Sequence, residues 1–192
     1  MNPELQDYLR QIDAITADAR SLVAPLSDAE WRRRPAPERW SVAENIDHLC
    51  VGMRAVLPAL DRAIEDARAR GLTAPGPFRY GWVARLIVRE MEPPVKRRLK
   101  TVPIFLPGEP PARDAALAEL LRTHDELAER VRRADGLDLK RARVTSPASR
   151  LLRVSLGAYL AFLLAHDRRH LWHIRQMLPS TDALADGRKA GA

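Results

Sequence analysis

Apolar residues recur every three to four positions along most of this chain, and that spacing limits its fold more than any other feature. The first such stretch covers about residues 3 to 25. Its apolar positions are Leu5, Leu9, Ile12, Ile15, Leu22 and Leu26. Residues at these intervals lie on one face of a helix with 3.6 residues per turn. Similar stretches cover about residues 41 to 69, 113 to 134 and 149 to 178, with a shorter one near 82 to 91.

The four long stretches predict an all-α protein. No strand-like alternation of any length, no internal repeat and no glycine-rich phosphate loop interrupts them. A long segment, from GLTAPGPF to KTVPIFLPGEPP, separates the second helix from the third. We therefore expect a four-helix bundle with a long crossover between helices two and three. Residues 1–178 would form this single domain, and residues 179–192 a flexible C-terminal tail.

The start of the second helix is marked by the sequence SVAE, at residues 41 to 44. In a capping box of this kind the Ser41 hydroxyl accepts from the Glu44 amide, and the Glu44 carboxylate accepts from the Ser41 amide. Pro58 lies inside the same helix, where its ring removes one backbone hydrogen bond. We expect a bend there.

Composition and charge exclude several classes of protein. Apolar residues make up 46% and charged residues 30% of the 192, which is a globular balance. The net charge of +7 comes mostly from arginines scattered among acids, and the one compact basic cluster, VKRRLK (95 to 100), has no aromatic residues for base stacking. We therefore do not expect nucleic-acid binding. No apolar run approaches the roughly 20 residues of a membrane span, and because the N-terminus is amphipathic with early acids we expect no secretory signal there. Cys50 is the only cysteine, so no internal disulfide can form, and a cytoplasmic location is the default.

Three of the five histidines lie in HDRRHLWH, residues 166 to 173. His166 and His170 are four residues apart, so they share one helix face and could bind a single metal ion at about 2.0–2.1 Å. His173 lies roughly 10 Å along the helix axis from His166, too far for all three to bind the same ion. A third protein ligand would have to come from another helix.

The candidates for that ligand are His48 and His124. His48 falls about 120° from the centre of the apolar stripe of its helix, at the edge of a groove between helices. His124, in LRTHDELAERV, is surrounded by charges and resembles a surface residue. Pairs of histidines at this spacing also occur without a metal, so ordinary packing or surface roles stay open.

Asp167 falls near the middle of the apolar face of the last helix. A carboxylate in that position needs a cation or a hydrogen-bond donor, since an unpaired buried charge is costly. A histidine ring of the site could be its partner, and so could a buried arginine.

Three segments together resemble the DinB/YfiT-like superfamily of metal-binding four-helix bundles. They are RWSVAENIDHL (39 to 49), LKTVPIFLP (99 to 107) and AHDRRHLWHI (165 to 174), and the likeness covers roughly residues 5 to 178. The resemblance implies that His48, His166 and His170 bind a divalent metal.

The resemblance leaves other roles open. The family often has glutamine where this chain has His173, which could touch the edge of the site, contact substrate or only pack. Asp167, His173 and Glu44 are candidates for support of the ligands or for substrate contact. Glu44 either orients the His48 ring or only completes the capping box. Trp40, beside that box, is expected to pack against the helix start.

Three neutral imidazoles leave coordination positions of a divalent ion vacant, which is typical of a catalytic site. Zinc or nickel is the first expectation, and iron or manganese also suits imidazole. The resemblance implies an enzyme that activates a thiol or water for attack on a small electrophile, first of all a thiol S-transferase using a low-molecular-weight thiol. The alternatives are a non-catalytic, stress-associated metal-binding protein and a metal-dependent hydrolase.

The last helix is apolar nearly all round, because Ala161, Ala165 and Trp172 lie away from its main apolar stripe. Such a helix is either central in the bundle or covered by a partner subunit. We expect a homodimer.

Overall fold

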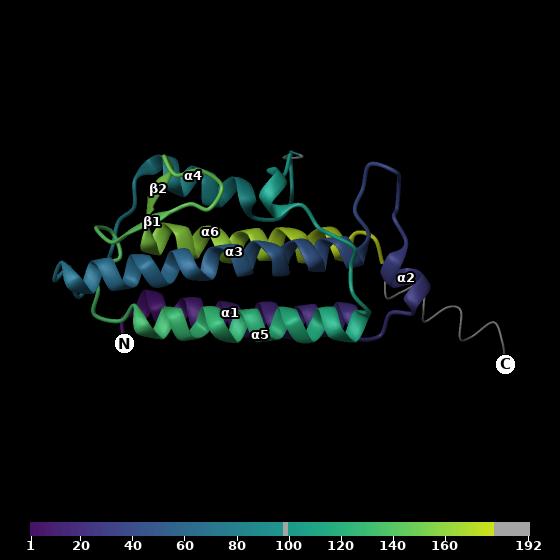
Figure 1. The fold of residues 1–192 in the computed structure, drawn as a ribbon, viewed down its shortest axis with the longest axis horizontal. Coiled ribbons are helices and arrows are strands. Elements are labelled where there is room, and N and C mark those ends of the chain that lie inside the picture. Colours follow the sequence, from purple (N-terminus) through teal and green to yellow (C-terminus); the bar gives the residue numbers. More distant parts are fainter. Residues whose placement is uncertain (98–99, 179–192) are drawn as a thin grey trace.

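The computed structural model describes residues 1–97 and 100–178 of the chain. Four long helices pack side by side in it as a bundle (Figure 1). They are α1 (Pro3–Val23), α3 (Val42–Ala69), α5 (Arg113–Arg133) and α6 (Leu156–Arg175). Helices α1 and α3 each contact both α5 and α6, and the apolar core lies between the four. The prediction of an all-α four-helix bundle is confirmed.

The direction of the helices explains the long crossover. Helices α1 and α6 run one way along the bundle, and α3 and α5 run the other way, as the colour gradients of Figure 1 show. Since α3 has 28 residues and is about 42 Å long, the chain must return that distance before α5 can begin. Residues 70–112 make this return and carry α4 (Trp82–Met91) and the 3₁₀-helix η1 (Pro103–Phe105).

Helix α3 begins as the sequence predicts. The side chain of Ser41 accepts from the Glu44 amide at 3.1 Å, and the Glu44 carboxylate accepts from the Ser41 amide at 2.8 Å. Pro58 lies within the continuous helix. A second capping box, between Ser27 and Glu30, starts the short helix α2 (Asp28–Arg32), which the sequence did not predict. The buried side chain of Trp31 holds α2 on the bundle.

The predicted start of the last helix at residue 149 is wrong. Residues 153–155 form a strand instead, and α6 begins at Leu156. This strand, β2 (Arg153–Ser155), pairs antiparallel with β1 (Arg143–Thr145). Strands of three residues contain too few alternations for their period to be recognised in the sequence.

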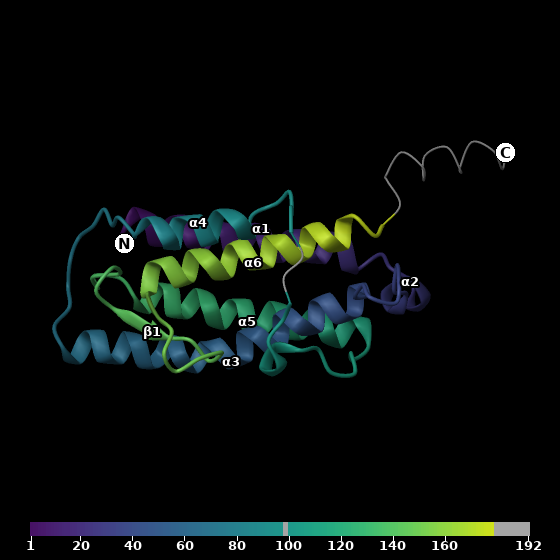
Figure 2. The same ribbon diagram turned by 90° about the horizontal axis from the view of Figure 1, so that it is seen from above.

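Helix α4 lies along α6 on the outside of the bundle (Figures 1 and 2). Helix α6 is thus enclosed by α1, α3 and α4, and Ala165 is buried within a single chain. This enclosure accounts for the apolar character of α6 around Ala165, while Ala161 and Trp172 stay half-buried. The homodimer stays a prediction, and the expected flexible tail, 179–192, lies outside the described residues.

Within the described part of the chain, no helix combines the length and the apolar character that a membrane span requires.

Candidate metal centre

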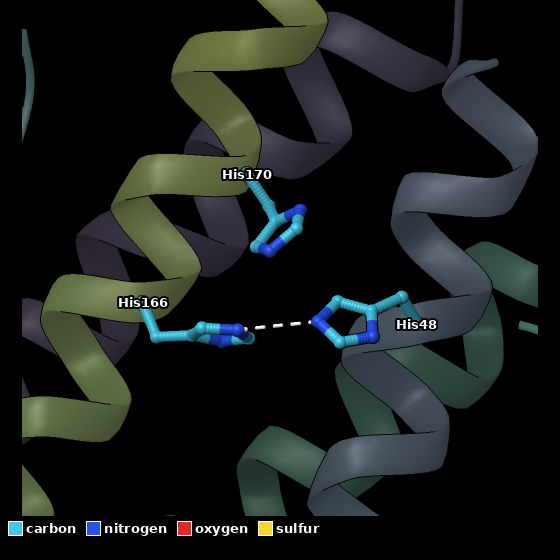
Figure 3. A group of neighbouring side chains, drawn as sticks. All are labelled: His48, His166 and His170. Carbon is cyan, nitrogen blue, oxygen red and sulfur yellow. Dashed lines mark hydrogen bonds between the residues drawn. The ribbon is translucent and has the colours of Figure 1, made fainter. Parts of the chain in front are cut away.

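The antiparallel packing of α3 and α6 places the first turns of α3 opposite the second half of α6. His48 projects from α3 toward His166 and His170 of α6, as Figure 3 shows. One ring nitrogen from each of the three residues lies within 4.8 Å of those of the other two. The Nε2 atoms of His48 and His166 are 3.1 Å apart. The structure therefore brings together the three histidines that the sequence singled out.

The spacing of these nitrogens suits a common cation. Two ligands held at about 2.0–2.1 Å from one ion in a tetrahedral arrangement are about 3.3–3.4 Å apart. The Nε2–Nε2 distance of 3.1 Å is close to this value. Two lone pairs that face each other at such a distance repel unless a proton or a metal ion lies between them. The residues present fit a divalent metal.

A backbone carbonyl fixes the proton of the His48 ring. The Nδ1 atom of His48 lies 2.6 Å from the carbonyl oxygen of Phe105, at the end of η1. Because a carbonyl can only accept, Nδ1 carries the hydrogen and Nε2 presents its lone pair to the cluster. His48 is 3% exposed, so it is more deeply buried than the groove edge predicted from its helix, since the crossover covers it.

The side chain of Asn45 fixes the proton of the His170 ring in a similar way. The side-chain nitrogen of Asn45 donates to the Ser41 carbonyl at 2.8 Å, so its oxygen faces the ring and accepts from Nδ1 of His170 at 2.8 Å. The Nε2 lone pair of His170 is left for the cluster. Asn45 and Phe105 were not among the site residues predicted from the sequence. Asn45 stands three residues before His48 on the same face of α3, which was a usable signal, whereas no pattern indicated the Phe105 carbonyl.

Burial keeps two of the rings neutral. It lowers the pKa of His48 to about 4, with a further contribution from the nearby His166. Burial also lowers the pKa of His170 well below its ordinary value, and the other two histidines of the cluster act in the same direction. A neutral imidazole is the form that binds a metal.

The sequence model of the DinB superfamily matches residues 11–174 of the chain. The chain belongs to the DinB superfamily. No curated protein sequence matches it. Among solved structures it is similar to YfiT from Bacillus subtilis, described as a probable metal-dependent hydrolase with an unusual four-helix bundle topology. The two share 14% identity and a TM-score of 0.60, over 92% of this chain and 87% of that one. At this identity the likeness shows the fold, and it confirms the bundle topology.

Behind the cluster of this DinB superfamily member lies a buried pair, Asp167 with His124. Nε2 of His124 lies 3.1 Å from the Asp167 carboxylate, and Nδ1 lies 2.8 Å from the Leu120 carbonyl. Both neighbours are acceptors, so both ring nitrogens donate. Burial opposes charge on each partner, but the hydrogen bond between them raises the pKa of His124 and lowers that of Asp167. The other carboxylate oxygen lies 3.9 Å from Nδ1 of His166.

His124 was expected at the surface, and that expectation is wrong, since its exposed fraction is 0%. The charged neighbours in the sequence point to other faces of α5. Asp167 has the histidine partner that was one of its two predicted alternatives, although the ring belongs to His124.

A cavity of about 430 Å³ opens onto the cluster between α6, the start of α3 and the crossover. His166, His170 and His173 line it, and Trp40 and Phe105 contribute apolar wall. The Trp40 ring packs against the cluster, with its centroid 4.9 Å from that of His48 and 6.0 Å from that of His170. Trp40 therefore does more than pack against the start of α3. The cavity could admit a small molecule to the histidines.

The other candidate residues lie outside the cluster of three histidines. Glu44 pairs with Arg34 and completes the capping box with Ser41, so its hydrogen bonds point away from His48. His173 lines the cavity outside the group of three, with its ring centroid 6.1 Å from that of His170. Cys50, two residues after His48 in α3, is buried and points away from the cluster to the Ala116 carbonyl.

Proposed function

We propose that this protein is a metal-dependent enzyme that activates a thiol or water for attack on a small electrophilic molecule, most specifically as a thiol S-transferase. His48, His166 and His170 would hold the divalent metal, with zinc or nickel expected before iron or manganese. One observation supports this above all. Three imidazoles from two helices converge where a cavity of about 430 Å³ reaches the protein interior.

The metal would supply Lewis acidity, which lowers the pKa of a thiol or water to a value near neutrality. The residues of the chain do the rest. The Phe105 carbonyl and Asn45 hold the rings of His48 and His170 with their Nε2 lone pairs inward. Trp40 packs against the rings of His48 and His170 and would restrict the access of water on that side.

The reacting thiol would come from a small molecule. Cys50 is buried, points to α5 and has its pKa raised to about 12, chiefly by burial. A thiol in that state is a poor nucleophile at neutral pH. The partners of the protein would therefore be a low-molecular-weight thiol and a small electrophile.

A hydrolase is the second candidate, because YfiT is described as a probable metal-dependent hydrolase. In that case water would take the place of the thiol. A non-catalytic, stress-associated metal-binding protein is the third. The cavity beside the cluster favours an enzyme over such a protein, since a purely structural metal site needs no access for substrate.

Metal analysis tests the site itself. We expect untagged wild-type protein to hold about one equivalent of zinc or nickel, and a His48→Ala, His170→Ala double variant to hold none. His173→Ala is the matched control, because it removes a histidine from the same cavity but outside the cluster. It should keep the metal. A wild-type protein that takes up no metal and gains no thermal stability from either ion would overturn the proposal.

Activity separates the candidate functions. The metal-loaded protein is incubated with a reactive electrophile and a panel of small thiols, and in parallel with activated esters and no thiol. Conjugation that depends on both thiol and metal supports the transferase. Ester hydrolysis without thiol supports the hydrolase. If neither reaction is observed, the result supports the non-catalytic metal-binding protein.

A further inference from the structure

Arg169 lies on α6 next to the clustered histidines, three residues after His166 and directly before His170. It is 6% exposed and lines the cavity. Its guanidinium donates to two backbone carbonyls of the crossover, that of Glu90 at 3.1 Å and that of Arg97. Both acceptors are neutral.

No carboxylate in the described part of the chain neutralises this charge. Within residues 1–97 and 100–178, no acidic oxygen lies within 4.0 Å of the Arg169 guanidinium. The preceding residue, Arg168, is different, because it pairs with the carboxylate of Glu92. Burial lowers the pKa of Arg169, and only the more distant Glu90 acts in the opposite direction. A buried cation without a counterion is costly to a fold unless a ligand supplies the charge.

Arg169 has N–H groups left that could donate to a ligand. A guanidinium carries five N–H hydrogens, and the two carbonyl bonds use two of them. The side chain lines the cavity beside His166 and His170, so its remaining donors are near the place where a small molecule would bind.

The other charged residues that line the cavity are mainly basic. Arg39 and Lys100 also line it, and Glu38 is its one acidic lining residue. None of these three forms an ion pair with another residue in the described part of the chain. Arg54 on the bundle surface, by contrast, pairs with Glu119. The cavity therefore has an excess of positive charge beside the histidine cluster.

We propose that the small molecule bound in this cavity carries an oxyanion, a carboxylate or a phosphate, which Arg169 binds while the opposite end of the molecule reaches His166 and His170. The role given to the histidines rests on the proposed function, but the oxyanion site does not. Arg39 and Lys100 would raise the local concentration of such anions without fixing their position. Arg169 would fix it, because a planar guanidinium binds oxyanions directionally.

Benzoate and benzamide are suitable probes, because they have the same shape and differ in charge. Their binding to the full-length protein is measured by calorimetry, with and without one equivalent of zinc. We expect benzoate to bind wild-type protein about tenfold more tightly than benzamide, in both metal states. Phenylphosphonate in a third arm shows which oxyanion is preferred.

Arg169→Gln should abolish the preference for benzoate and leave the zinc content unchanged. Arg168→Gln is the matched control, since this neighbour also ties α6 to the crossover but through Glu92 and away from the cavity. It should keep the preference. Retention of the full preference by folded Arg169→Gln protein would overturn the proposal.

The measurement on wild-type protein tests the oxyanion site even if Arg169→Gln protein fails to fold. Equal affinities for benzoate and benzamide overturn the oxyanion site, and so does a preference that appears only with zinc, since the metal would then be the anion ligand. Zinc content, measured on the same samples, tests the metal site separately. A preference for benzoate in protein that cannot bind zinc would support the oxyanion site while the proposed function fails.

Discussion

At the scale of single residues, the five histidines of this chain occupy very different environments. Three converge on one point, His173 lines the cavity beside them, and His124 is enclosed in the core. The case of His124 shows how local sequence can mislead. Its neighbours Arg122 and Asp125 are charged, but the residues on its own helix face, Leu120 and Leu127, are buried.

Removing one partner of the buried His124–Asp167 pair should lower the free energy of unfolding strongly, because the other partner is left buried without its hydrogen bond. Replacing His124 alone by Leu leaves a buried carboxylate without its donor, and we expect a loss of about 3–5 kcal/mol in the free energy of unfolding. Replacing both residues by Leu should cost much less than the sum of the single changes. Urea unfolding of the four proteins in the presence of a chelator measures this. Additive losses would contradict a direct interaction.

Cys50 should be almost inert in the folded protein. Burial, and to a smaller degree Glu119, raise the pKa of its thiol to about 12, so at pH 8 the thiol keeps its proton. We expect an aromatic disulfide reagent to release colour very slowly at pH 8, and to titrate one thiol per chain in urea. As a control, a Cys50→Ala variant should give no signal in urea. Rapid reaction of the native protein would show that the residue is accessible.

At the scale of elements, the first two turns of α3 work as one unit. Ser41 caps the helix, and its carbonyl orients Asn45, which in turn orients His170 across the interface. His48 follows on the same face. The crossover completes the arrangement through the Phe105 carbonyl and through the Gly108 amide, which donates to Asp47 at 2.8 Å.

Asn45 should therefore influence metal binding without being a ligand. An Asn45→Ala variant removes the acceptor that fixes the His170 ring, and we expect the affinity for zinc to fall about 10- to 100-fold. Asn45→Asp keeps an oxygen for His170 but loses the donor to the Ser41 carbonyl, so its affinity for zinc should fall less than that of Asn45→Ala. Competition with a chromophoric chelator measures both. Equal affinities for wild type and Asn45→Ala would show that packing alone orients the ring.

At the scale of the whole molecule, the parallel directions of α3 and α5 require the long return of residues 70–112. That return lines one side of the cavity and places helix α4 on the outside of α6. It also supplies the Phe105 carbonyl that accepts from the His48 ring. The topology that distinguishes this bundle is therefore also what covers its candidate site.

The oligomeric state stays a prediction. Helix α6 is covered within one chain, but α4 exposes a large apolar side chain, Trp82, which is 71% exposed, and beside it Val83 and Ile87. Exposed apolar patches of this kind often mark contacts between subunits. We expect light scattering to show a homodimer at micromolar concentration, and a Trp82→Glu variant to shift toward the monomer. A monomeric wild type would contradict this expectation.

The four long helices, the capping box at Ser41 and the shared helix face of His166 and His170 were predictable from the sequence alone. These features depend on spacing along a single helix, and the helical period relates that spacing directly to geometry. The tertiary structure decided the rest: the depth of His48 beneath the crossover, the burial of His124 against Asp167, the hairpin before α6 and the cavity beside Arg169. Each of these depends on contacts between segments distant in the sequence, and no local pattern encodes which segments will meet.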